Sequence, residues 1–123
     1  ASFIGSMNFI PAIINSSNKV KCNQIEINCD IGNFQANDSV QLAIRPEDIQ
    51  FTQGSQDDNM IPGTIKEVEF LGSFQRVYFE VRNITDELII VDVPSSTARK
   101  IELDVNKEMN LYFSKEDARI YST

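Results

Sequence analysis

The side chains able to carry chemistry in this sequence are mainly carboxylates. Adjacent acids occur at Glu47-Asp48 and Asp57-Asp58, and such pairs can serve as general acid and base, although acids on a turn are usually solvated surface. The chain has no His, which removes the commonest general base and every Ser-His or Cys-His nucleophile arrangement. We therefore predict no catalytic residue in this chain.

The two cysteines, Cys22 and Cys29, do not indicate a disulfide framework or a metal site. Cys29 continues the alternation of Ile25 and Ile27, so we expect it in the core. A zinc site needs two further ligands, and the sequence offers none of obvious identity. Neither G-x-x-x-x-G-K-[ST] nor G-x-G-x-x-G occurs, so we predict no cofactor-binding and no metal-binding residue.

One polar stretch, "PSSTARK" at 94–100, has the composition of an anion-binding loop. Hydroxyl groups, backbone N–H groups and basic side chains together favour oxyanions. The candidate residues are Ser95, Ser96, Thr97, Arg99 and Lys100. An ordinary polar loop is the alternative interpretation.

The net charge of −7, from 18 acidic and 11 basic residues, argues against a nucleic-acid partner, because neutralising phosphates requires clustered Lys and Arg. It equally argues against docking on an anionic membrane surface. Tyr78 and Phe79 could stack on bases in a nucleic-acid-binding barrel. Without a basic groove, however, core and surface packing is the better interpretation of both.

Short alternating segments separated by turn residues dominate the sequence. "RVYFEVR" is typical of them, with Val77, Phe79 and Val81 on one face. Other expected strands are "QIEINCDI", "VQLAI", "TIKEVEFL", "ELIIVDV" and "EMNLYF". A spacing of about ten residues predicts an all-β antiparallel barrel or sandwich. "PSSTARKIEL" allows one helical turn capped by Ser95 or Ser96.

An internal repeat divides the chain. "NFIPAII" at 8–14 is matched by "NMIPGTI" at 59–65, and each copy opens one half. The halves close with "LAIRPEDIQF" and "LYFSKEDARIY". In both closing phrases we expect a strand, one helical turn and a short strand. Pro46 suits the first helical position of one turn, and Ser114 with Asp117 suggests a capping box in the other.

Neither half has enough strands to bury its core and its edges alone. We therefore predict one composite domain at 8–123, made of halves at about 8–53 and 59–123. Residues 1–7 are expected to end a linker from a preceding domain. An isolated 1–53 segment is expected to be unfolded or aggregated.

Four stretches carry a family resemblance: "SFIGSMNFIPA", "LAIRPEDI", "GTIKEVEFLGSFQRVYFEV" and "LYFSKEDARIY". In this order they resemble the C-terminal transport-associated OB (TOBE) domain of ATP-binding subunits of ABC importers. The resemblance covers nearly the whole chain. It implies an OB-fold-like β-barrel assembly from two related halves.

The resemblance also implies a function. Such a domain regulates the ATP-binding subunit and helps two copies pair, on the cytoplasmic side and peripheral to the membrane. Expected partners are the second copy of the ATPase subunit, the transmembrane permease subunits through the missing domain, and a regulatory protein or small ligand. ATP and Mg are expected only in that missing domain. The alternative is an oxyanion-type small-ligand-binding module.

The residues carried over are architectural. Arg45, Pro46 and Glu47 match the family's "RPE" phrase, and Leu71, Gly72 and Ser73 match its "LGS" phrase. We expect Gly72 to permit a backbone conformation or a close approach at a hairpin, and Arg45 to pair with Glu47 or Glu116. The chain lacks the phosphate loop and catalytic carboxylate of the ATPase, so we predict no ATP hydrolysis by this piece.

Overall fold

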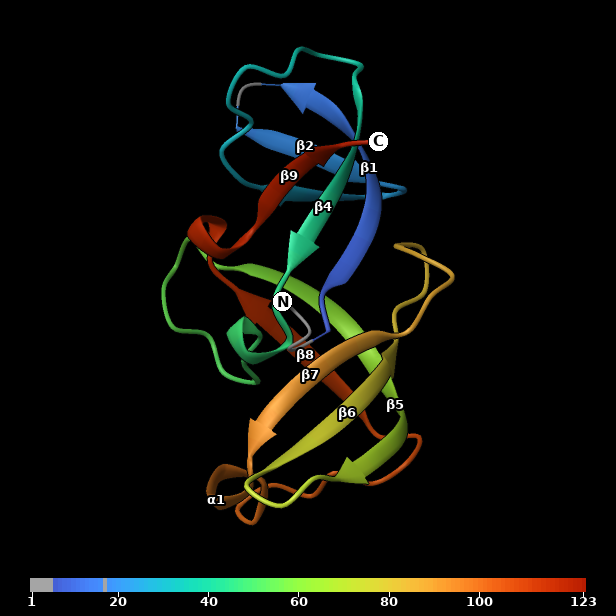
Figure 1. Ribbon diagram of the computed structural model, residues 1–123, viewed down its shortest axis with the longest axis vertical. Coiled ribbons are helices and arrows are strands. Elements are labelled where there is room, and N and C mark those ends of the chain that lie inside the picture. Colours follow the sequence, from blue (N-terminus) through green and yellow to red (C-terminus); the bar gives the residue numbers. More distant parts are fainter. Residues whose placement is uncertain (1–5, 17) are drawn as a thin grey trace.

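The computed structural model describes residues 6–16 and 18–123, and this part of the chain is all-β (Figure 1). The expected linker at 1–7 lies largely outside the described residues. In chain order the elements are β1 (Asn8–Ser16), β2 (Lys19–Cys22), β3 (Ile25–Asn28), β4 (Ser39–Ile44), η1 (Pro46–Asp48), β5 (Asn59–Phe70), β6 (Phe74–Glu80), β7 (Ile89–Pro94), α1 (Ser95–Ala98), β8 (Glu108–Phe113), η2 (Lys115–Asp117) and β9 (Arg119–Ser122).

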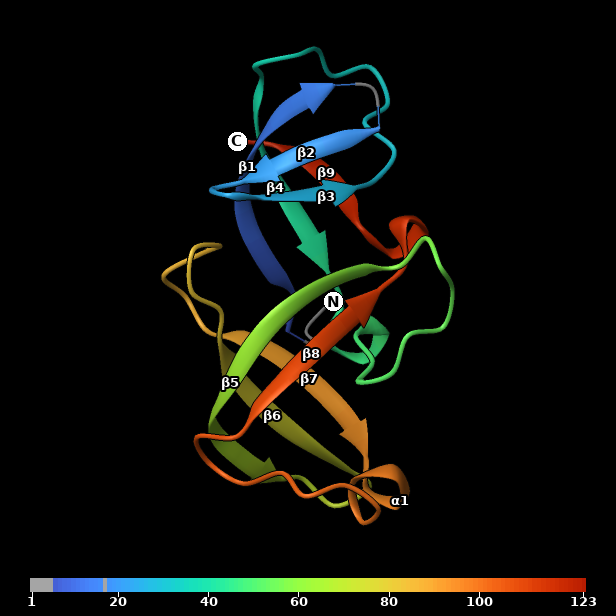
Figure 2. The same cartoon turned by 180° about the vertical axis from the view of Figure 1, so that it is seen from behind.

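The strands form two curled antiparallel sheets. One has five strands in the order β3-β2-β1-β4-β9, and the other has four in the order β7-β6-β5-β8. The two sheets stack along the long axis of the molecule, with β1 to β4 at one end and β5 to β8 at the other (Figures 1 and 2). Strand β9 breaks the sequence order, because it follows the second half in the chain but pairs with β4 of the first. The predicted all-β, OB-like assembly is confirmed.

The repeated N-x-I-P segments begin β1 and β5. Their side chains alternate strictly between buried and exposed, which places Ile10 and Ile61 in the core and both prolines on the surface. Proline is tolerated because this first part of each strand pairs on one side only, Pro11 with Gln41 and Pro62 with Asn110. The second neighbour joins only further along each strand.

The strand register shows that the halves are structural repeats. Asn8 lies opposite Ile44 of β4, and Asn59 lies opposite Phe113 of β8. A β-bulge follows at the same position of each repeat. Positions that share this register are equivalent in the two halves.

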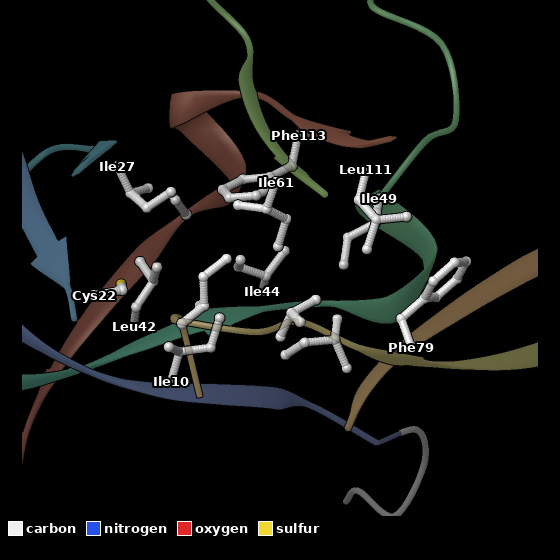
Figure 3. Close-up of a cluster of buried hydrophobic side chains, with 14 of the residues drawn as sticks. Ile10, Cys22, Ile27, Leu42, Ile44, Ile49, Ile61, Phe79, Leu111 and Phe113 are labelled. Carbon is white, nitrogen blue, oxygen red and sulfur yellow. The ribbon is translucent and has the colours of Figure 1, made fainter. Parts of the chain in front are cut away.

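A single cluster of buried side chains runs through both sheets. Figure 3 shows Ile10 and Ile44 of the first half in the same cluster as Ile61 and Phe113 of the second. Cys29 is 1% exposed, as expected for a core residue. Because the cluster is continuous, burial on one sheet stabilises the other.

The predicted strands are present, with shorter bounds in places. "QIEINCDI" is a strand only at Ile25–Asn28, because the chain then leaves the sheet into a loop. Val77, Phe79 and Val81 are buried as predicted. The helical turn of "PSSTARKIEL" exists, but its N-cap is Pro94, so the expected cap by Ser95 or Ser96 is wrong.

Candidate functional site

The two closing phrases form matching corners. In each, a strand ends, a single 3-10 turn follows, and the chain re-enters a sheet. Pro46 occupies the start of the first turn and is buried, as predicted. In the second turn Ser114 holds the N-cap position, but its hydroxyl donates to the Asp117 carboxylate at 3.0 Å rather than accepting from the backbone. The Asp117 N–H instead donates to the Ser114 carbonyl at 3.1 Å.

Arg45 does not form the expected ion pair. Among the described residues no carboxylate lies within ion-pair distance of it, so the predicted partners Glu47 and Glu116 are wrong. The Arg45 side chain is exposed. Its positive charge lowers the pKa of Asp48, but less than burial and the charge of Asp117 raise it. Burial and the nearby charge of Asp117 raise the pKa of Asp48, and Arg45 partly offsets this rise. The charge of Asp117 in the second turn therefore acts on Asp48 in the first.

In each half, the segment that follows the 3-10 turn pairs with a strand of the other half. After η1, Gln50 exchanges two 2.8 Å backbone hydrogen bonds with Tyr112 of β8. After η2, Arg119 of β9 pairs with Ala43 of β4. By register, Gln50 corresponds to Arg119 and Tyr112 to Ala43. The exchange is therefore reciprocal, and each sheet is completed by the opposite half.

Two buried asparagines tie the halves together in the same reciprocal way. The Asn8 amide donates to the Ile90 carbonyl at 2.8 Å and accepts from the Ile90 N–H at 2.7 Å. The Asn59 amide donates to the Asn28 carbonyl at 2.9 Å and accepts from the Asn28 N–H at 2.8 Å. The clamped residues lie on β7 and β3, which are edge strands of their sheets. Each amide thus replaces one residue of a missing neighbouring strand.

The "LGS" turn has the structural role expected of it. Gly72 has a φ of +84°, which favours glycine, while a side chain there would meet nothing within 4 Å. The glycine therefore serves backbone conformation, not a close approach. The Leu71 N–H donates to the Phe74 carbonyl at 2.9 Å and closes the hairpin between β5 and β6.

The candidate anion loop lies against this turn. Ser95 donates its hydroxyl to the Gly72 carbonyl at 2.7 Å and its N–H to the Ser73 carbonyl at 2.9 Å. These two donors are therefore already used inside the protein. The exposed members of the loop are Ser96, Thr97, Arg99 and Lys100. Anion binding by this loop stays a prediction.

An open slot of about 840 Å³ lies at the free edge of the five-stranded sheet. Residues 28–32 and Phe34, at and after the end of β3, form one wall. Lys115 and Glu116 of η2, together with residues 118–120, form the other. Asn18, Lys19 and Asp57 complete the rim. These segments lie along one flank of the molecule (Figure 2). Its size is that of a small-molecule site.

The equivalent place in the second half is closed. There η1 packs directly against β7, whereas η2 makes no comparable contact with β3. Phe51 lies against Phe79 with ring centroids 5.8 Å apart. By register the first half has the smaller Ile120 and Val20 at these positions. Smaller side chains at matched positions explain why one slot is open.

The described residues contain no group of acidic, Cys or His side chains arranged for a metal ion. Both cysteines are free and buried, and burial raises the pKa of Cys22 to about 12 and that of Cys29 to about 11. The thiols are therefore protonated and poorly nucleophilic at neutral pH. No helix among residues 6–16 and 18–123 is long and apolar enough to cross a membrane.

The aromatic side chains considered for base stacking are engaged elsewhere. Phe79 is fully buried, and the Tyr78 hydroxyl donates to the Glu69 carboxylate at 2.5 Å. That hydrogen bond is the main cause of the raised pKa of Tyr78. Phe79 has no exposed face on which a base could stack.

Sequence reasoning found the repeat but missed what its asparagines do and missed the slot. The matched positions of Asn8 and Asn59 were the available signal, because a polar residue repeated inside an apolar alternation needs a partner. The slot had no such signal. Of its basic residues, Lys115 and Arg119 are close in the sequence, but Lys19 and the wall at the end of β3 lie more than eighty positions earlier.

Comparison with known proteins adds family evidence. A family model described as "TOBE domain" matches residues 42–120. "Fe(3+) ions import ATP-binding protein FbpC 2" of Rhizobium meliloti is 22% identical over 99% of this chain and 34% of that protein. "Spermidine/putrescine import ATP-binding protein PotA" of Onion yellows phytoplasma is 24% identical over 98% of this chain and 26% of that protein. This chain thus spans about a quarter to a third of such relatives.

A solved structure shares the fold. The cytoplasmic molybdate-binding protein ModG, with molybdate bound, superposes with a TM-score of 0.79 over 100% of both chains at 9% sequence identity. At this identity the likeness shows the fold alone.

Proposed function

Because the chain belongs to the TOBE domain family, we propose that it is the accessory, regulatory and dimerisation domain of the ATP-binding subunit of an ABC importer. The observation that carries the proposal is the pattern of coverage. Import ATP-binding proteins match this chain almost from end to end, yet it accounts for only 34% and 26% of their lengths. The remaining length is expected to hold the ATP and Mg site.

The proposed partners are a second copy of the subunit, the transmembrane permease subunits reached through the ATP-binding domain, and a regulatory protein or ligand. The proposed location is the cytoplasmic face of the membrane. The names of the two relatives include chemically different solutes, ferric ion and polyamines, so the proposal does not extend to the solute.

An exposed apolar face supports pairing with a second copy. Phe9 and Ile13 on β1 are 48% and 49% exposed, and Tyr121 on β9 is 48% exposed. They share one face of the five-stranded sheet, since Pro11 between them pairs with Gln41, which pairs with Tyr121. Exposed apolar side chains gathered on one face favour association.

Extending the reading frame upstream of the Ala1 codon tests the parent protein. A G-x-x-x-x-G-K-[ST] sequence a few hundred residues earlier supports the proposal. A frame that lacks it contradicts the proposal. For the pairing surface, sedimentation of the whole subunit should show a dimer weakened by Ile13→Glu but not by Glu102→Gln, an exposed control away from this face.

A second candidate function is oxyanion binding. The shared fold with a molybdate-binding protein favours it, and the loop of Ser95, Ser96, Thr97, Arg99 and Lys100 is the predicted site. A thermal-shift series with molybdate, sulfate, phosphate and phosphonates tests it. Unchanged melting with all four classes contradicts this function and leaves the importer role intact.

A further inference from the structure

The open slot has an apolar floor and a charged rim, and the proposed role in the importer requires neither. Its floor is apolar, with Ala118 buried and Ile31, Phe34 and Ile120 half-buried. Its rim is charged and polar. A concave apolar floor with a few converging polar groups is the usual form of a small-molecule site.

The rim carries both signs of charge in equal number. Its cations are Lys19, Lys115 and Arg119, and its carboxylates are Asp30, Asp57 and Glu116. Lys19 contacts Glu26 at 4.0 Å. Within the part of the chain that the structure describes, the other five groups form no ion pair. Their charges are therefore available to a ligand.

The second half, where the equivalent place is closed, has a carboxylate that can be compared with Asp30. Asp92 corresponds to Asp30, since each lies two residues after a residue clamped by an asparagine. Asp92 receives two hydrogen bonds from Arg76, at 2.8 and 3.0 Å. Asp30 accepts only the N–H of Gly32, at 2.9 Å. The carboxylate is thus neutralised in the closed half and left unpaired in the open half.

The balance of charge selects the ligand class. A simple anion entering the slot meets three carboxylates in a chain of net charge −7, and a polycation meets three basic groups. A ligand that carries both charges satisfies both sets. We propose that the open slot binds a small dipolar solute, with a carboxylate toward Lys115 and Arg119 and an ammonium group toward Asp30.

Thermal-shift measurements on the whole chain test this with named probes. The first set is glycine betaine, γ-aminobutyrate, lysine, leucine and phenylalanine, and the contrast set is acetate, sulfate, molybdate and spermidine. We expect at least one dipolar probe to raise Tm by about 4 °C at ten times its Kd. We expect no rise with the contrast set.

Two substitutions in the slot test whether the ligand binds there. Ile120→Phe copies Phe51 of the closed half and should abolish the shift while leaving the chain folded. Arg119→Gln copies Gln50 and should weaken binding at least tenfold, because it removes the charge that meets the carboxylate. Arg82→Gln, an exposed arginine outside the slot and outside the candidate anion loop, is the matched control and should leave the ligand-induced shift unchanged.

Three outcomes overturn the proposal: no probe raises Tm, only contrast probes do, or the shift survives both slot variants. If Ile120→Phe fails to fold, Arg119→Gln decides alone. Because these measurements need no ATP-binding domain, a negative result leaves the proposed role in an importer untouched. A shift by molybdate that depends on Arg99 instead supports the oxyanion function.

Discussion

The two halves of the molecule share strands, corners and clamps, but they differ at the slot between the turn and the edge strand. In the second half η1 rests on β7 and the ring of Phe51 lies against Phe79. In the first half Ile120 and Val20 take these positions, and a cavity of about 840 Å³ remains. A duplicated fold can therefore close this place in one copy with larger side chains and leave a cavity at it in the other.

The largest effect is expected from separating the halves. A 1–53 segment lacks β9, which completes its sheet, and Asn59, which clamps its edge strand. We expect it to show no cooperative thermal transition by circular dichroism, since its apolar face is uncovered. A sharp transition from this segment would show that the halves are independent and would remove the basis for treating them as one unit.

Removing one clamp should be the next largest effect. Asn8→Ala and Asn59→Ala each delete two hydrogen bonds and leave a backbone donor and acceptor without partners. We expect the free energy of unfolding to fall by about 2–3 kcal/mol in either variant, measured by urea denaturation. Asn110→Ala, an exposed asparagine on β8, is the control. A loss confined to one of the two clamps would show that the halves are not equivalent at this junction.

Opening the closed slot should cost less. Phe51→Ile gives the second half the residue found at 120 in the first and removes packing against Phe79. We expect a loss of about 1–2 kcal/mol in the free energy of unfolding. Phe70→Ile, at a phenylalanine that is 77% exposed, should change stability by less than about 0.5 kcal/mol. Equal losses at the two sites would refute the account of why only one slot is open.

The smallest expected effect concerns the two acidic turns. Burial and the charge of Asp117 raise the pKa of Asp48 in the folded chain, so the folded state holds this proton more tightly than the unfolded state does. Ionisation of Asp48 therefore lowers stability as pH rises from the ordinary aspartate pKa through the raised one. We expect Asp48→Asn to raise Tm slightly at pH 7 and to have no effect at pH 3. A lower Tm at pH 7 would contradict this sign.

The fold was largely predictable because it depends on local patterns. Alternating side chains located most of the strands, and the repeated phrases located both corners with their helical turns. The sequence patterns did not locate β2, and they overestimated the length of β3, since Cys29 continues the alternation after the strand has ended and remains buried in the loop that follows.

The candidate site was much less predictable, because it depends on packing between distant segments. No pattern around Arg119 shows that it faces a cavity formed with residues 28–34, about ninety positions earlier. Arg45 shows the opposite difficulty, since nearby acids in the sequence suggested an ion pair that the exposed side chain does not form. Side-chain size at matched positions, not residue type in a motif, separates the open slot from the closed one.

Because the halves exchange their closing segments, the peptide link at 52–58 is not the main interaction that holds them together. The halves hold each other through strand pairing on both sides, Gln50 on β8 and β9 on β4, so the covalent connection mainly sets their effective concentration. A chain cut within this link therefore contains two complementary pieces, each able to supply the strand that the other lacks. The molecule is, in this sense, a heterodimer carried on one chain.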